Sequence, residues 1–208
     1  ASAAIYGSKA ANGVILVTTK RGKSGKAMVS YNGNVSLSNV STLIERLDSY
    51  DYARLYNDLL SQTGASPRFT DEDIRLFKDG SDPYGHPNTK WLDYIFRTGF
   101  MHKHNLNVSG GSEDVKYMAS AGFLGQEGTM KNSDRQQFNI RTNLDIKLSD
   151  KFTMRTNMAF IHNQYSNPNA SYGGGSGQLI RQAARMAPWI PYKKEDGSYG
   201  SISDGNPV

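Results

Sequence analysis

The stretch Arg135–Leu148 reads RQQFNIRTNLDIKL and decides the fold that the sequence predicts. From Phe138 to Leu148, every second position carries an apolar side chain or threonine, and the positions between carry amide or charged side chains. A period of two is typical of a β-strand with one apolar and one polar face. Strands of soluble domains are usually ~3 to 10 residues long. This stretch is longer, and it has the length that a membrane-spanning strand needs.

Four other stretches follow the same plan, over about residues 28–38, 102–110, 115–124 and 152–163, beside the first at 135–148. Only Ser149-Asp150-Lys151 separates the last two strands, and Gly110-Gly111-Ser112-Glu113 separates the second from the third. Connections this short join antiparallel neighbours. The sequence therefore predicts a mainly β protein that contains at least two hairpins.

The composition is polar for an ordinary packed core. Of the 208 residues, 37% are hydrophobic, and the mean hydropathy is −0.59. No apolar run approaches the ~18 residues of a spanning helix, so strands must make any membrane crossing. The net charge of +5 permits an anionic partner, but no element carries the basic stripe with stacking aromatics that nucleic-acid binding uses. We therefore expect no nucleic-acid partner.

The two ends of the sequence lack the features of true termini. The chain begins Ala1-Ser2-Ala3 without an initiator methionine, and it ends at Val208 in a loop-like stretch. We therefore expect it to be a piece of a longer protein. Cysteine is absent from the chain, which excludes disulfides, thiolate metal sites and cysteine nucleophiles within it.

Two stretches carry a family resemblance. Residues 3–22, AAIYGSKAANGVILVTTKRG, resemble the end of the plug domain of TonB-dependent outer-membrane transporters in the form used by the SusC/RagA family. Residues 91–100, WLDYIFRTGF, followed by 104–111, HNLNVSGG, resemble the start of the second barrel strand in that family. The resemblance extends from Ala1 to about Tyr165. It implies a partial transmembrane antiparallel β-barrel that carries the C-terminal end of a plug domain, with short helices in the extracellular loops.

This resemblance divides the chain into three parts. Residues 1–22 are expected to end the plug domain, 23–27 to form a linker, and 28–208 to form the N-terminal part of the barrel, with long loops at 39–101 and 166–208. The linker is placed where the hydrophobic pattern changes from the continuous apolar run Val14–Lys20 to alternation. Long and short connections then alternate in the way that outer-membrane barrels require, except that the link over 125–134 is of only intermediate length for an outer loop.

The first long loop carries two helix signals. Asp48 and Ser49 are suited to cap a helix that reaches about Ser61, and it would pack through the stripe Tyr52, Leu55, Tyr56 and Leu59. Thr70-Asp71-Glu72-Asp73 predicts the start of a second, shorter helix with acidic residues at its positive end. A third short helix is expected over Gln178–Met186, ended by Pro188.

The resemblance also implies a function. A SusC/RagA-like transporter imports oligosaccharides or peptides with a SusD-like lipoprotein, and the TonB-ExbB-ExbD complex supplies energy through an N-terminal part that precedes this chain. Such a protein is a multi-pass barrel surrounded by the lipid of the bacterial outer membrane. The alternative is a soluble β-rich carbohydrate-binding module, whose strands would bury their apolar face on a core. We expect no enzyme, because no acid, base and nucleophile are arranged for catalysis.

The expected functional residues fall into three groups. Tyr6, Gly7, Asn12 and Gly13 match the plug motif of the family. The residues expected to line the barrel lumen are polar side chains of two strands: Asn139, Arg141, Asn143, Asp145, Lys147, Arg155 and Asn157. Loop aromatics are suited to stack on sugar rings or peptides, and the candidates are Tyr84, Trp91, Tyr172 and Trp189.

Other motifs have simpler interpretations. Gly173–Gly177 lacks the Gly-Lys-Ser/Thr ending of a phosphate-binding loop. His102 and His104 share one strand face, but no carboxylate or cysteine at suitable spacing completes a metal site. The sequence therefore predicts neither a metal nor a cofactor.

Overall fold

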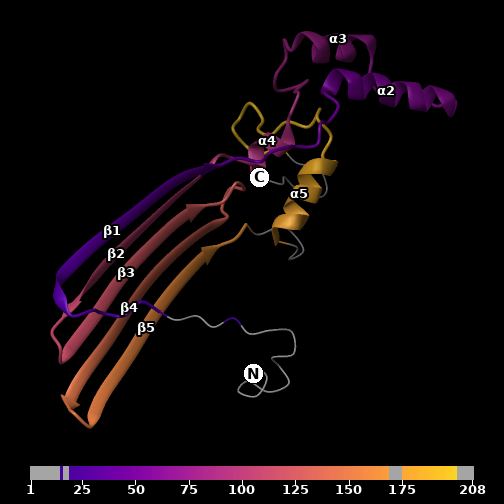
Figure 1. Cartoon of the computed structure of the whole chain (residues 1–208). Coiled ribbons are helices and arrows are strands. Elements are labelled where there is room, and N and C mark those ends of the chain that lie inside the picture. The colour runs from indigo at the N-terminus through magenta and orange to yellow at the C-terminus, as the bar shows by residue number, and fades with distance from the viewer. Residues whose placement is uncertain (1–14, 16–18, 169–174, 201–208) are drawn as a thin grey trace, which may run out of the picture. The chain divides into compact units, whose positions relative to one another are not determined.

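The computed structural model of the chain describes residues 15, 19–168 and 175–200. Five strands form one antiparallel sheet in the order β1-β2-β3-β4-β5, which is also their order in the sequence (Figure 1). They are β1 (Gly25–Ser38), β2 (Gly99–Gly111), β3 (Val115–Glu127), β4 (Asp134–Ser149) and β5 (Phe152–Ser166). The expectation of a mainly β protein is confirmed.

Each observed strand contains the predicted range and extends it at one end or both. Strand β1 begins at Gly25, so three residues of the expected 23–27 linker belong to the strand. The apolar run Val14–Lys20 lies mostly outside the described residues, and its last two residues, Thr19 and Lys20, have irregular backbone.

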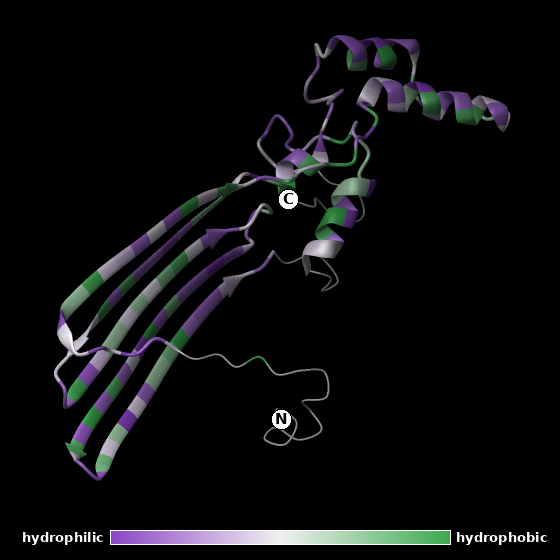
Figure 2. Ribbon diagram, viewed as in Figure 1, coloured by the Kyte–Doolittle hydropathy of each residue, from purple (hydrophilic) through white to green (hydrophobic). Residues whose placement is uncertain are grey.

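Hydropathy alternates along the strands and gives the sheet two unlike faces (Figure 2). Tyr31, Leu106, Phe123, Ile140 and Met158 lie on the apolar face, and all are at least 37% exposed. No second layer covers this face within the described ranges of the chain. The opposite face carries amide, hydroxyl and charged side chains.

The turn between β2 and β3 is built by short-range hydrogen bonds. Ser112 Oγ accepts from the backbone nitrogens of Asp114 and Val115, at 3.3 and 3.1 Å. Gly111 has a φ of +153°, and a side chain there would overlap the backbone of Val115. The tight turn therefore requires glycine at this position.

Contacts divide the chain into two compact units. The first contains the described residues of 1–33 together with 104–123 and 138–162, which form the strand ends next to the short turns. The second contains 34–103, 124–137 and the described residues of 163–208, including all of the helices that the structure describes.

The helices of the second unit are α2 (Ser49–Gln62), α3 (Asp71–Asp79), α4 (Trp91–Ile95) and α5 (Gly175–Arg185). The caps are as predicted: Asp48 accepts from the Asp51 nitrogen at 2.8 Å, and Thr70 and Asp73 form a reciprocal capping box. α4 was not predicted, because five residues are too few for a helical period to show.

One prediction about α2 is wrong in part. Leu55 and Leu59, expected to pack, are 50% and 54% exposed, while Ser49 and Ala53 are fully buried. The helix packs against Phe69 and Phe77 through Ala53, and also through Tyr56, which belongs to the predicted stripe. Sequence period alone does not distinguish these neighbouring stripes.

Two apolar clusters hold the second unit together. The larger joins α4 to α5 and the chain after it, through Trp91, Leu92, Ile95, Ala183, Met186 and Ile190. The smaller contains Ala53, Phe69 and Phe77, and Trp189 packs against both clusters. No helix among the described residues is long and apolar enough to cross a membrane.

Candidate functional site: the polar face of the sheet and the loop network

A four-residue segment before the sheet, Thr19–Gly22, lies on the polar face of β3 and β4, and we call it the docking segment. The Asn143 side chain of β4 donates to the Lys20 carbonyl oxygen at 2.6 Å and lies 3.4 Å from Thr19 Oγ1. The guanidinium of Arg21 forms an ion pair with the carboxylate of Asp145. Asn143 is 3% exposed, and its burial makes the hydrogen bond to the docking segment costly to lose.

Gly22 brings the docking segment into backbone contact with the sheet. A Cβ atom at this position would overlap the nitrogen, carbonyl carbon and oxygen of Tyr117 in β3. Glycine therefore allows the two backbones to approach closely.

A groove of about 370 Å³ lies beside the docking segment on the same face. Thr19 and Lys20 form part of its wall, and amide and hydroxyl side chains of three strands form much of the rest: Asn105, Asn107, Ser120 and Asn139, with Arg141. None of these five side chains forms a hydrogen bond with another residue that the structure describes. The groove thus combines these polar groups with apolar side chains, which are those of Met118, Ala121, Ile140, Ala159 and Ile161.

The other residues expected in the lumen have different surroundings. Lys147 pairs with Asp150 of the β4–β5 turn at 2.6 Å. Arg155 and Asn157 are exposed on β5. The plug-motif residues Tyr6, Gly7, Asn12 and Gly13 lie outside the described residues.

The candidate loop aromatics differ in exposure. Trp91 is 3% exposed, and its indole nitrogen donates to the Ala187 carbonyl oxygen at 3.0 Å. The structure thus gives Trp91 a packing position. Trp189 is half-buried, with the Arg68 guanidinium 4.8 Å from its ring. Tyr84 is half-exposed, and Tyr172 lies outside the described residues.

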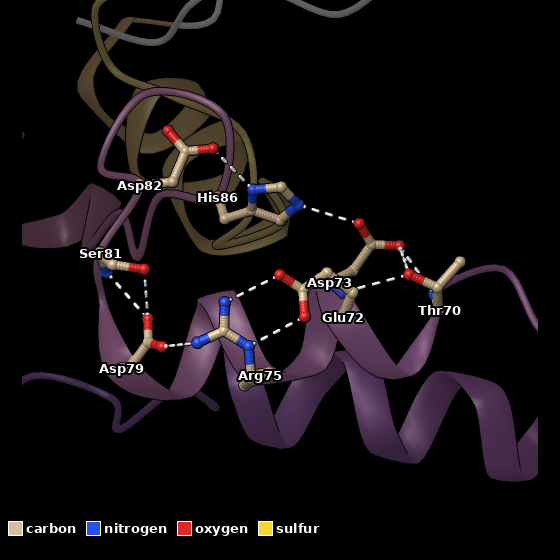
Figure 3. A network of polar contacts seen from close by, with 8 residues as sticks. All are labelled: Thr70, Glu72, Asp73, Arg75, Asp79, Ser81, Asp82 and His86. Carbon is tan, nitrogen blue, oxygen red and sulfur yellow. Dashed lines mark hydrogen bonds and ion pairs between the residues drawn. The ribbon is translucent and has the colours of Figure 1, made fainter.

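A charged network joins α3 to the loop that follows it (Figure 3). The His86 ring lies between two carboxylates, with Nε2 2.9 Å from Asp73 and Nδ1 2.8 Å from Asp82. Arg75 lies between two further carboxylates, bound to Glu72 one turn before it and to Asp79 one turn after it. The sequence predicted capping acids at Asp71 and Asp73 but not the histidine bridge, because His86 is 13 residues from Asp73.

The bridge shifts the pKa values of His86, Asp73 and Asp82. Burial lowers the pKa of His86, but the hydrogen bonds to Asp73 and Asp82 outweigh it, so the pKa lies above its usual value of 6.5. The hydrogen bond from His86, with those from Thr70, holds the pKa of Asp73 below its usual value. The Gly85 amide and His86 do the same to the pKa of Asp82. The histidine thus stabilises the loop fully below pH 6.5, and this contribution is lost as the pH rises through its raised pKa.

The contacts of the docking segment and the His86 bridge both hold chain segments in place. Within the described residues, no three His, Cys, Asp or Glu side chains are grouped to hold a metal ion. Sequence reasoning also missed the contact between the docking segment and β4. Arg21 and Asp145 are 124 residues apart, and no local pattern connects them.

The chain matches no protein-family model. It is 32% identical over 208 residues to TonB-dependent receptor P3 of Formosa agariphila, a match that covers 99% of the chain and 19% of the relative. It is 34% identical over 175 residues to TonB-dependent receptor SusC of Bacteroides thetaiotaomicron, covering 82% of the chain and 16% of SusC.

Solved structures share the fold. The RagAB peptide importer in its "closed-closed" state matches with a TM-score of 0.67 and 21% identity, covering 98% of this chain and 26% of that one. The RagAB peptide transporter matches with a TM-score of 0.69 and 20% identity over 94% of this chain and 24% of that one. The chain spans about a fifth of the length of the curated relatives it matches. From its similarity to P3 and SusC over most of its own length, the chain belongs to the SusC-like TonB-dependent receptors, a family that does not consist of enzymes.

Proposed function

We propose that the chain forms the first part of the wall of an outer-membrane β-barrel that imports a solute in a TonB-dependent manner. The observation that carries this proposal is the exposed apolar face of a sheet with strands of 13 to 16 residues. A spanning strand needs ~9 to 11 residues, with apolar side chains toward lipid. The strands meet both requirements.

The exposed face also argues against the soluble carbohydrate-binding module. Val35, Leu37, Met158 and Phe160 are between 57% and 68% exposed. A soluble β-sandwich would cover such side chains with a second sheet. Lipid would cover them in a barrel.

In the proposed barrel, the polar face lines the lumen and meets the plug. The docking segment would be the end of the plug, in line with a plug region at 1–22, a linker that begins at Lys23, and a barrel region that follows to residue 208. The contacts of Asn143 and Asp145 with this segment support their assignment as lumen residues. Asn139 and Arg141 line the groove on the same face, so they would also face the lumen.

The connections fit one membrane orientation. The β2–β3 and β4–β5 turns are short, while the connection from β1 to β2 is long and contains α2, α3 and α4. Since outer-membrane barrels have short periplasmic turns and longer external loops, the long connection with its three helices would lie outside the cell. Tyr84 and Tyr172 remain candidates for ligand contact there.

The partners are proposed from relatives. By analogy with SusC and the RagAB importer, a SusD-like lipoprotein would deliver an oligosaccharide or peptide from outside, and the TonB-ExbB-ExbD complex would act on the plug from the periplasm. No described residue selects between the two substrate classes.

A pair of neighbouring substitutions in the full-length parent protein tests the barrel. Met158 lies near the middle of β5 on the apolar face, and Asn157 lies beside it on the polar face. A lysine facing lipid at the midplane costs about 2–4 kcal/mol. We therefore expect Met158→Lys to reduce the yield of outer-membrane protein with heat-modifiable gel mobility, and Asn157→Lys to retain it.

The membrane barrel and the soluble sheet predict different results for these two variants. In an open soluble sheet, Met158 already faces water at 62% exposure, so both lysine variants would be tolerated. Fractionation of the parent protein into the soluble part of the cell, without a heat-dependent shift in mobility, would also refute the proposal.

A further inference from the structure

The guanidinium of Arg68 lies over three aromatic rings of the second unit. Its central carbon is 4.8 Å from the centre of the Trp189 ring, 5.7 Å from that of Phe69 and 5.8 Å from that of Tyr56. Cations are attracted to the faces of aromatic rings at such distances. Phe69 is buried and packs edge to face against both other rings. The three rings therefore form one packed cluster beneath the guanidinium, which we call the ring cluster.

The side chain of Asn57 on α2 fixes the backbone that carries Arg68. Its amide oxygen accepts from the backbone nitrogens of Arg68 and Phe69, at 3.0 and 3.1 Å. Its amide nitrogen donates to the Phe69 carbonyl oxygen at 2.7 Å. Backbone and side chain of Arg68 are thus both held in place before any ligand arrives, which lowers the entropy cost of binding one.

Arg68 presents its positive charge at the surface. The residue is exposed, and within the part of the chain that the structure describes no carboxylate pairs with it. Arg75 on α3 differs, because Glu72 and Asp79 already bind its guanidinium. A carboxylate binds two N–H groups of a guanidinium side by side, which an aromatic ring cannot do. Contact with the ring cluster therefore orients Arg68 without taking the place of an anion.

We propose that Arg68, with the partly exposed rings of Tyr56 and Trp189, forms a binding site for a carboxylate of the imported solute. The guanidinium binds the carboxylate, and the two rings contact the group that carries it. Two solute classes offer such a group, namely peptides and oligosaccharides that contain a uronic acid. The inference rests on the proposed transport function, in which the connection that contains Arg68 lies outside the cell, and it adds the charge of the solute.

Competitive retention of solutes by the purified full-length parent protein tests the site. A peptide hydrolysate and a polygalacturonate hydrolysate are each mixed in equal amounts with a methyl-esterified portion of the same material, which lacks free carboxylates. Mass spectrometry gives the ratio of acid to ester among the solutes that the protein retains from each mixture. We expect acids to be favoured by about tenfold in one mixture, because hydrogen bonds between charged partners are the strong ones. The mixture that shows the preference identifies the solute class.

Three variants separate this site from the overall charge of the protein. Arg68→Gln should bring the ratio to within about twofold of equality, because it removes both charge and fork. Arg75→Gln removes the same charge from an arginine that two carboxylates already bind, so the ratio of the parent should be retained. Arg68→Lys keeps the charge without the fork and should give an intermediate ratio. Heat-modifiable gel mobility verifies that each variant is folded.

The outcomes for the site and for transport are distinguishable. A preference that is unchanged in Arg68→Gln, or lost equally in Arg75→Gln, would overturn the carboxylate site and leave Arg68 as a cover for the ring cluster. Retention of acid and ester alike by the parent, in both mixtures, would overturn it as well. Equal uptake of both mixtures by cells with and without the gene would instead refute the transport function, whatever ratio the purified protein gives.

Discussion

Removal of the Asn143 side chain should release the docking segment and expose it to protease. In Asn143→Ala, the Lys20 carbonyl oxygen loses the hydrogen bond that Asn143 Nδ2 donates at 2.6 Å. Lys20 is exposed, so its carbonyl can bind water instead, and the net loss is about 0.5–1.5 kcal/mol. Since 1.36 kcal/mol is a factor of ten, the open population should rise by about 2- to 13-fold.

The segment reports its own opening, because Lys20, Arg21 and Lys23 are trypsin sites. When a segment recloses faster than it is cleaved, the cleavage rate follows its open population. We therefore expect cleavage in this region of the folded parent protein in detergent to accelerate by the same factor in Asn143→Ala. Mass spectrometry of the fragments identifies the cut and gives its rate.

Asn139→Ala is the matched control. Asn139 lies on the same strand and face, but its side chain binds no described residue, so the cleavage rate should stay within about twofold of the parent. Heat-modifiable mobility should be retained in both variants, which separates local opening from loss of the fold. An unchanged rate in Asn143→Ala, or equal acceleration in Asn139→Ala, would refute the reasoning.

Three further outcomes are expected in the full-length protein. Gly22→Ala should also accelerate cleavage at the docking segment, because a Cβ there overlaps backbone, whereas Gly177→Ala on α5 meets open space and should not. Trp91→Ala should expose the α5 amides to hydrogen exchange, since emptying a buried tryptophan site costs about 3–5 kcal/mol, while Tyr84→Ala should leave them protected. The loop around His86 should exchange faster, after correction for intrinsic rates, as the pH rises through its raised pKa, and His86→Gln should abolish this dependence. Equal α5 exchange in both aromatic variants, or an unchanged pH dependence in His86→Gln, would contradict the corresponding assignment.

Local patterns predicted most of the secondary structure. The alternation of β4 and the capping signals at Asp48 and Thr70 depend on neighbours within a few residues, so they are readable without a structure. α4 is shorter than two turns and gives no period to read. The packing face of α2 was predicted only in part: Tyr56 packs, but Leu55 and Leu59 are exposed, because burial depends on which elements cover the helix.

For the functional residues, too, the sequence predicted some features and not others. The sequence was sufficient to place Asn143 and Asp145 on the polar face, since side-chain direction follows from a period of two. It also suggested the loop aromatics by residue type, but type does not show exposure: Trp91 is buried and Tyr84 is not.

Alternating side chains within each strand determined the mainly β fold and the two unlike faces of the sheet, because neighbours along an extended chain point in opposite directions. The partners of the polar face were decided only when β3 and β4 were brought beside the docking segment. Arg21 meets Asp145, and Asn143 meets Lys20, across more than 120 residues of chain. Contacts at that separation depend on the register of several strands together, which no local pattern in the sequence specifies.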